Sequence, residues 1–472
     1  MNKKWFAVLR VFVLVSTLVL STFSYTFAGP NFPDIQKHWA KTWIERAVKE
    51  GIVTGYPNGT FQPDRPLSRA EFSTILVKAS KLAGVDAVLP FKDVPKAYWG
   101  YEFIQKAYAK GWIAGFPDGT FQPDKPVNRE QAAVILTKKM EAETRGVAYQ
   151  IPYANVLDKN NISEWAFTQV AWLMQESIIK GTTNKTFLPQ KPLTRAEAVV
   201  MLLNVLDYKA PQPKNMVLST TTSTYDSGLL DVIIPIYEAS NHVRVKVISV
   251  GTGQAITTAR SGDADCILVH DRAAEDLFMK DGFGSYRLDV MYNDFILIGP
   301  ASDPKDIKET NSILEAFKKI AQTEATFISR GDKSGTHSKE LGIWKSAGIE
   351  PTGKSWYVSA GQGMGAVLLM ANEKQAYTLT DRATYLKYIK DKKINLVIIN
   401  EGSAQLLNPY GIMPVSPQKY PHVQYDFANK LCLFMTGIPG QKMIGEYGVK
   451  DFGSPLFFPD SLEYKAYLKN KK

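Results

Sequence analysis

A dense group of hydroxyl side chains stands at residues 220–224, where the sequence reads TTTST. Thr and Ser hydroxyls donate hydrogen bonds without adding net charge, so several of them together suit a small oxyanion. An apolar segment starts shortly afterwards at Leu229, which places the group between a predicted strand and a predicted helix. The chemistry that this group favours is the binding of an anion.

Three more polar clusters have the same setting, each ahead of a predicted helix. They read GTGQA at 251–255, RGDKSGTH at 330–337 and GQGMG at 361–365. A helix start offers unpaired N–H donors and partial positive charge, and Arg330 adds a full charge on a planar fork that suits an oxyanion. Helix capping explains one such cluster, but several of them at strand-to-helix junctions favour an anion site.

The segments that must position these clusters alternate between strand and helix patterns. Such alternation indicates an α/β fold with parallel sheets, and ligands of open α/β sheets bind at the carboxyl ends of strands. This half of the chain is long enough for two lobes with a cleft between them. The strands we expect are Met216–Thr220, Val243–Val250, Cys266–His270, Phe295–Gly299, Thr326–Ser329, Ala376–Thr380 and Asn395–Ile399, with helices at Gly228–Glu238 and Thr252–Arg260.

The first half of the chain repeats one pattern three times. The copies read GYPNGTFQPDRPLSRAE from Gly55, GFPDGTFQPDKPVNREQ from Gly115 and GTTNKTFLPQKPLTRAE from Gly181. Repeats of this length indicate stacked units, none of which can bury its apolar face alone. Pro-Asn-Gly and Pro-Asp-Gly are turn sequences, and we expect the third copy, with Thr-Thr-Asn-Lys, to have lost this turn.

Each copy ends in a helix start that carries an arginine. Ser68-x-x-Glu71 is a capping box, and the other copies have the same spacing. The residue after each cap is Arg69, Arg129 or Arg195, where a positive charge opposes the helix dipole. This recurrence has two explanations that the sequence leaves open: an internal ion pair, or the binding of an anionic group.

Composition and targeting signals place the mature protein outside the cytoplasm. Residues 1–28 have the basic start, the short apolar run and the small-x-small end of a signal peptide. The formal net charge is +10, which suits an anionic partner, but no nucleic-acid motif occurs and nucleic acid is not expected as a partner.

Cys266 and Cys432 each lie in an apolar run, which favours two free buried thiols over a disulfide.

With Ser68-Arg69-Ala70-Glu71 and its two counterparts, residues 31–207 resemble three S-layer homology (SLH) domains. That resemblance implies a helical three-repeat unit that grips a pyruvylated secondary cell-wall polymer through Arg69, Arg129 and Arg195. It also implies a secreted protein held in the cell wall or S-layer of a bacterium. The domains we expect are a signal peptide at 1–28, repeats at 29–90, 91–150 and 151–207, a stiff linker with few contacts at 208–214 and a two-lobed domain at 215–472.

The second half resembles the substrate-binding component of a bacterial ABC transporter for tungstate, of the TupA type. The resemblance rests on the hydroxyl cluster and on GTG at 251, MYNDF at 291, SRGDKSGTH at 329, GQGM at 361 and YTLTDR at 377. It implies a two-lobed fold of the periplasmic-binding-protein type (type II) that closes on tungstate or molybdate and serves a membrane permease. Carried over by motif, the ligand-binding residues are Thr221, Thr222, Ser223, Thr252, Arg330, Ser334, Gly335 and Thr336, and no cofactor or metal cation is expected.

The identity of the oxyanion depends on whether the pocket can accept a proton from its ligand. The third predicted strand of this half is followed by His270 and Asp271. If His270 faces the ligand, the pocket contains only donors and favours anions that are unprotonated at neutral pH, such as tungstate, molybdate and sulfate. A structural role explains His270 equally well.

Two other functions fit the motifs less well. SLH repeats often carry hydrolases, but no histidine of the second half lies in a nucleophile elbow or a metal-ligand pair, so we do not expect an enzyme. A purely structural surface-layer protein would need no ligand cleft and would tolerate the loss of Arg330.

Overall fold

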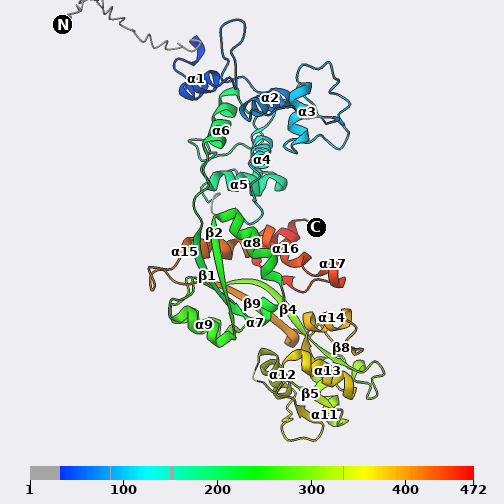
Figure 1. Cartoon of the computed structure of the whole chain (residues 1–472). Helices are drawn as coiled ribbons and strands as arrows, with labels where there is room; N and C mark the ends of the chain where they lie inside the picture. The colour runs from blue at the N-terminus through cyan, green and yellow to red at the C-terminus, as the bar shows by residue number, and fades with distance from the viewer. Residues whose placement is uncertain (1–31, 85–86, 149–153, 333, 472) are drawn as a thin grey trace, which may run out of the picture.

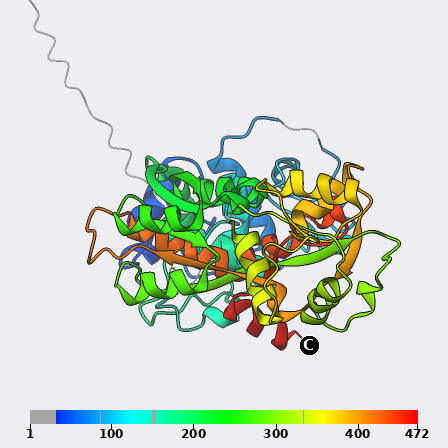
Figure 2. The same ribbon diagram turned by 90° about the horizontal axis from the view of Figure 1, so that it is seen from below.

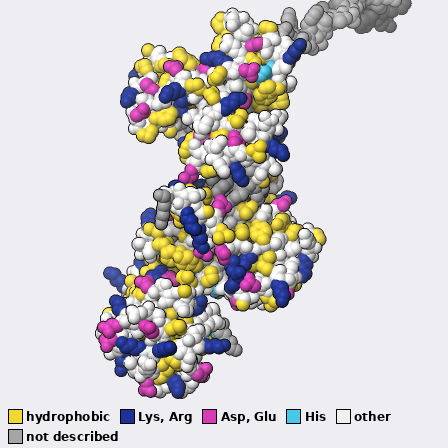
Figure 3. Space-filling model, turned by 180° about the vertical axis from the view of Figure 1, so that it is seen from behind, with side chains coloured by type: hydrophobic (Ala, Val, Ile, Leu, Met, Phe, Trp, Pro, Cys, Tyr) yellow, Lys and Arg dark blue, Asp and Glu magenta, His cyan; other side chains and the backbone are white. Residues whose placement is uncertain are grey.

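The computed structural model of the chain describes residues 32–84, 87–148, 154–332 and 334–471. The repeats, a first lobe and a second lobe follow one another along the long axis of the molecule (Figure 1), and the space-filling view shows the same succession (Figure 3). Among the described helices, none is both long and apolar enough to cross a membrane. The predicted signal peptide lies outside the described residues.

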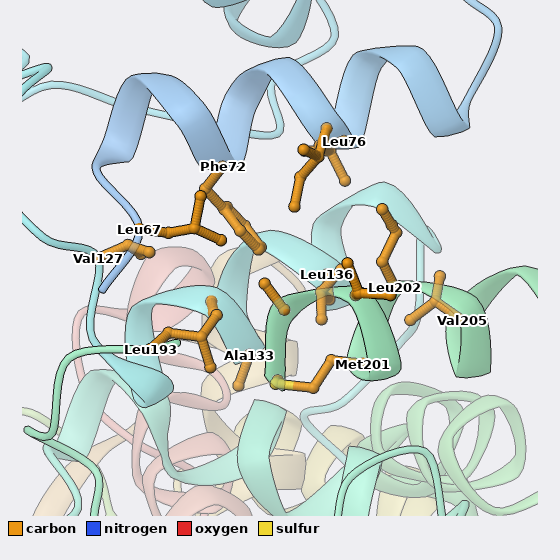
Figure 4. Packing of buried hydrophobic residues seen from close by; sticks show 14 of the residues in the cluster. Leu67, Phe72, Leu76, Val127, Ala133, Leu136, Leu193, Met201, Leu202 and Val205 are labelled. Atoms are coloured by element: carbon orange, nitrogen blue, oxygen red, sulfur yellow. The ribbon is translucent and has the colours of Figure 1, made fainter. Parts of the chain in front are cut away.

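Each repeat contributes two helices, and the repeats close into a ring. The first helices are α1 (Lys41–Lys49), α3 (Tyr101–Ala109) and α5 (Phe167–Gln175), and the second helices are α2 (Arg69–Ala79), α4 (Arg129–Lys139) and α6 (Arg195–Asp207). The second helix of each repeat packs against the first helix of another: α2 on α3, α4 on α5 and α6 on α1. The apolar faces of all three repeats therefore share one core (Figure 4).

Three backbone hydrogen bonds join the repeats around this core. The N–H of Leu67 donates to the carbonyl of Leu193 at 2.9 Å, that of Leu193 to Val127 at 2.8 Å, and that of Val127 to Leu67 at 3.0 Å. The side chains of the same residues point into the common core (Figure 4). No repeat thus satisfies its own backbone at this position, so the three depend on one another.

The turn of the third repeat is present, and the prediction that it is lost was wrong. The N–H of Thr182 donates to the carbonyl of Thr186 at 2.7 Å, as the matching residues do in the first two repeats. Gly59 and Gly119 adopt φ of 77° and 78° at the tight position, and Lys185 adopts 57° there. A non-glycine residue reaches this left-handed region at some cost, and the surrounding contacts impose it.

The first lobe is built on a mixed sheet. In spatial order its strands are β2 (Val243–Val250), β1 (Lys214–Thr221), β3 (Cys266–Val269), β9 (Leu407–Pro414), β4 (Leu288–Gly299) and β10 (Phe458–Pro459). β1 is parallel to β2 and β3, whereas β9 is antiparallel to β3 and β4. The two-lobed α/β fold is confirmed, but the expectation of parallel sheets fails because the chain leaves this lobe on β4 and returns on β9.

The second lobe continues from β4. The far half of β4 pairs with β7 (Thr378–Asp381) and β8 (Val397–Asn400), and β5 (Phe327–Ser329) pairs in parallel with β6 (Tyr357–Ser359). The helices of this lobe are α11 (Ile313–Gln322), α12 (Gly335–Ser346), α13 (Met364–Lys374) and α14 (Arg382–Lys390). The view from below shows the two lobes side by side (Figure 2), and β4 and β9 connect them.

Eight helices are described in the first lobe. They are α7 (Thr222–Asp226), α8 (Leu229–Asn241), α9 (Thr252–Arg260), α10 (Arg272–Lys280), α15 (Tyr425–Thr436), α16 (Ile438–Glu446), α17 (Val449–Phe452) and α18 (Leu462–Asn470). The short helix α7, inside the hydroxyl cluster, was not predicted. Cys266 and Cys432 are free and buried, as predicted, with their sulfur atoms 3.6 Å apart.

The repeats are docked on the first lobe, so the expected linker with few contacts does not describe this junction. The N–H of Gly146 donates to Oγ of Ser240 at 3.1 Å, and Nδ2 of Asn241 donates to the Gly146 carbonyl at 2.9 Å. A Cβ on Gly146 would lie 2.5 Å from the carbonyl oxygen of Ile236. Ala148, two residues on, is part of the core of the first lobe.

Two polar groups extend the junction on either side of this contact. The hydroxyl of Tyr208 donates to Glu176 at 2.8 Å and lies 3.0 Å from Nε2 of His242. Glu164, in the third repeat, pairs with Lys442 of α16 and accepts a hydrogen bond from Tyr467 of α18 at 2.9 Å. Helices α8, α16 and α18 of the first lobe thus all contact the repeats.

Candidate anion-binding site

The hydroxyl cluster divides into internal and outward-facing members. Thr220 donates to the carbonyl of Leu268 at 2.7 Å, and the hydroxyls of Thr221 and Thr224 lie 2.6 Å apart. Thr222 is exposed at the first residue of α7. Thr220 and Thr224 therefore fix the end of β1, while the side chain of Thr222 is exposed. The side chain of Ser223 lies outside what the structure describes.

Thr252 stands at the same edge of the sheet as this cluster. β1 and β2 are parallel and end together, with Thr221 paired to Val250. Gly251 follows in an extended conformation, and Thr252 is the first residue of α9. Because the carboxyl ends of parallel strands share one edge, the two predicted donor groups of the first lobe are neighbours.

The second-lobe residues cluster between β5 and α12. Ser334 caps α12 and accepts a hydrogen bond from the N–H of His337 at 3.3 Å, and Thr336 is buried in the first turn. Arg330 follows the end of β5 and bonds Oδ2 of Asp332 through Nε at 3.1 Å and Nη2 at 2.5 Å. The predicted residues Arg330, Ser334, Gly335 and Thr336 thus form one group.

A carboxylate inside the second lobe supports the strand that carries Arg330. Glu340 of α12 accepts hydrogen bonds from Ser329 at 2.6 Å, Tyr357 at 2.7 Å and Trp344 at 3.1 Å. Burial raises the pKa of Glu340, and these three donors act against that rise. The bonds tie β5, β6 and α12 together directly behind the predicted ligand-binding loop.

The two groups of residues approach each other where His270 meets the start of α12. A Cβ on Gly335 would lie only 3.3 Å from Cε1 of His270. His270 follows β3 at the same sheet edge as the hydroxyl cluster, because β1 and β3 are parallel. The structure therefore brings the N-terminus of α12 in the second lobe to the predicted donor edge of the first lobe.

His270 is half-buried and has a polar partner. Burial lowers its pKa, and a hydrogen bond with Asn408 of β9 opposes that shift. Its ring lies 4.8 Å from the ring of Tyr410. The next residue, Asp271, caps α10 by accepting from the N–H of Ala274 at 3.1 Å. A neutral imidazole thus lies beside the site, and the carboxylate of Asp271 caps helix α10.

The repeat arginines form bonds from one repeat to the next. Nε of Arg69 donates to the carbonyl of Phe121 at 2.8 Å. Nε of Arg129 donates to Phe187 at 2.7 Å, and Nε of Arg195 donates to Phe61 at 3.0 Å. All three side chains are buried, and burial lowers the pKa of Arg69 to about 10. Of the two explanations for these arginines, the structure supports internal bonding; polymer binding by them stays a prediction.

Two features were assigned no function from the sequence. Asp332 received no role, although it stands two residues from Arg330 in RGDKSGTH. Trp39, Trp99 and Trp165 are more than half exposed and occupy the same place before the first helix of each repeat. In the described part of the chain, no group of His, Cys, Asp and Glu is arranged to hold a metal ion.

Comparisons with known proteins agree with this division of the chain. The model of the PBP superfamily domain matches residues 208–437, and that of the S-layer homology domain matches 31–73, 90–133 and 157–199. The tungstate-binding protein TupA of Peptoclostridium acidaminophilum is 48% identical over 249 residues, which are 52% of this chain and 86% of that protein.

A solved structure resembles the second half of the chain, and a surface protein resembles the repeats. The tungstate-binding protein TupA of Desulfovibrio alaskensis G20 superimposes with a TM-score of 0.50 at 41% identity, over 52% of this chain and 99% of that one. The cellulosome-anchoring protein of Acetivibrio thermocellus is 35% identical over 124 residues, 24% of this chain and 28% of that protein. The chain therefore belongs to the TupA family of ABC-transporter solute-binding proteins, joined on its N-terminal side to three S-layer homology domains that anchor proteins at the cell surface.

Proposed function

We propose that this protein captures tungstate, or the similar molybdate, outside the cell and supplies it to the permease of an ABC transporter. The observation that carries the proposal is the approach of α12 to His270, which places the helix start of one lobe against the donor edge of the other. A ligand between them would bridge the lobes, because only the closed form presents both sets of donors.

The donors suit a fully deprotonated tetrahedral dianion. We assign the ligand contacts to Thr221, Thr222, Ser223 and Thr252 on one side and to Arg330, Ser334, Gly335 and Thr336 on the other. Both nearby carboxylates, Asp271 and Asp332, already accept hydrogen bonds from the protein. We therefore expect hydrogen phosphate, whose proton needs an acceptor, to be disfavoured.

Calorimetric titration of the full chain with tungstate, molybdate, sulfate and phosphate tests this function. Sub-micromolar binding of tungstate and no measurable binding of phosphate are expected. Arg330→Ala should weaken tungstate binding by about 1.5–3 kcal/mol, since it removes a charged donor. Arg272→Ala, an exposed arginine of the first lobe, is the matched control. Unchanged affinity in Arg330→Ala would place the site elsewhere.

We also propose that the repeats hold the protein on a pyruvylated secondary polymer of the bacterial cell wall. The three exposed tryptophans support this, because exposed large aromatic side chains at equivalent positions are typical of binding surfaces. The full chain should sediment with purified walls and less so as salt rises, because the polymer is anionic. Sedimentation that is equal with walls stripped of the polymer would contradict the assignment.

A further inference from the structure

Arg330 is not an isolated positive charge at the candidate site. Its Nε and Nη2 atoms both bond Oδ2 of Asp332, at 3.1 and 2.5 Å, and its side chain is 19% exposed. A guanidinium has five N–H donors in a rigid fork. Asp332 engages only the edge formed by Nε and Nη2, and the opposite edge of the fork lies outside this ion pair.

The second oxygen of Asp332 fixes the start of helix α12. The N–H of Ser334 donates to Oδ1 of Asp332 at 3.1 Å, and Ser334 is the N-cap of that helix. One carboxylate therefore connects Arg330 with the helix start that meets His270. Burial alone would raise the pKa of Asp332, but the hydrogen bonds from Ser334 and Arg330 outweigh it and hold this pKa below its usual range. Asp332 is thus ionised at neutral pH.

We propose that Asp332 is the positioning residue of the anion site: it aims the outer edge of Arg330 and the N-terminus of α12 at one point and cancels the charge of the arginine. This inference rests on the proposed function. With that charge cancelled, the site selects its ligand by the directions of its hydrogen-bond donors rather than by net positive charge.

A positioning carboxylate and a merely repulsive one give opposite results when they are removed. A carboxylate that only repelled a dianion, or only competed for Arg330, would lower affinity, so its removal would tighten binding. A carboxylate that positions Arg330 contributes to affinity, because a misplaced donor no longer reaches the ligand. The sign of the change therefore separates the two roles.

The first experiment compares Asp332→Ala with the wild-type full chain by calorimetric titration with tungstate. Positioning predicts that affinity falls roughly tenfold or more, although the variant gains one positive charge. For the same reason the association rate should become more sensitive to salt. Asp306→Asn is the control: Asp306 is exposed in the same lobe, and its substitution changes the net charge by the same amount. It should leave the tungstate affinity and its salt dependence unchanged.

The second experiment repeats the substitution in a chain that already carries Arg330→Ala. Without its arginine Asp332 still holds the N–H of Ser334 but no longer positions a charged donor, so Asp332→Ala should weaken tungstate binding clearly less than it does in the wild-type background. Residues that act through each other show this kind of coupling in a double-mutant cycle. Equal weakening in both backgrounds would overturn the inference, as would unchanged or tighter binding in the single variant. A wild-type chain that binds no tungstate would instead overturn the proposed function itself.

Discussion

Replacing Arg129 by Ala separates the two explanations for the repeat arginines. The guanidinium donates to the carbonyls of Phe187 and Lys180 at 2.7 and 3.3 Å and to Glu197 at 3.0 Å. Its side chain is only 8% exposed. All three acceptors belong to the third repeat, so the substitution leaves one carboxylate and two carbonyls without this donor at the contact between repeats.

The expected cost is about 3–5 kcal/mol of unfolding free energy for the three-repeat unit, because two carbonyls and the Glu197 carboxylate lose a buried charged donor, and Lys191, 3.7 Å from Glu197, replaces it only in part. For a unit of this size that corresponds to a fall of roughly 6–20 °C in its melting temperature. Helix content should fall with it.

Calorimetric unfolding of the full chain in excess tungstate is the appropriate measurement. Ligand raises the transition of the two-lobed domain by mass action and leaves the transition of the repeats identifiable. Arg65→Ala is the control, because Arg65 is 41% exposed and its pair with Glu71 is expected to contribute about 0–1 kcal/mol. If Arg129→Ala melted like the control yet no longer sedimented with cell walls, the arginine would be a polymer ligand and the reasoning would be refuted.

Two glycine substitutions test the junction and the closure of the lobes. Gly146→Val places side-chain atoms against the backbone of α8 and should undock the repeats from the first lobe. Limited proteolysis should then cut the chain within residues 209–213. Gly84→Val is the control, because a Cβ at Gly84 meets no other atom, and it should leave residues 209–213 protected. Gly335→Val extends towards His270 and should weaken tungstate binding at least tenfold. Gly342→Ala is the control on the same helix, because a Cβ at Gly342 meets no other atom, and it should bind tungstate like the wild type. Equal tungstate affinities for Gly335→Val and Gly342→Ala would exclude a contact between α12 and His270 in the bound form.

Local patterns predicted most of the elements that carry the site. The strand Val243–Val250 and the helix Thr252–Arg260 were predicted with the bounds that the structure shows, because alternation and a glycine before the helix mark them. β9 was missed, since Pro409, Gly411 and Pro414 reduce strand propensity. Without β9 the sheet looked parallel, because the antiparallel neighbour that joins the lobes was absent from the prediction.

Contacts between distant segments could not be predicted in the same way. The positions of the repeat arginines were evident, but their partners belong to the next repeat, and only the folded ring shows that they are buried. Asp332 was overlooked because the pairing of a carboxylate with a nearby arginine depends on the loop conformation. The junction at Gly146 leaves no periodic signal, since a single glycine and two polar residues of α8 form it.

The closed ring gives the anchor an all-or-none character. Open arrays of repeats lose terminal units one at a time, because each unit contacts only its neighbours. Here the third repeat also bonds the first: Nε of Arg195 reaches the carbonyl of Phe61, and Arg46 of α1 pairs with Asp207 of α6. The ring has no expendable end, so a proteolytic cut that removes any one repeat breaks two contacts between repeats at once. Loss of the solute-binding protein from the cell surface would then follow from damage to a single repeat.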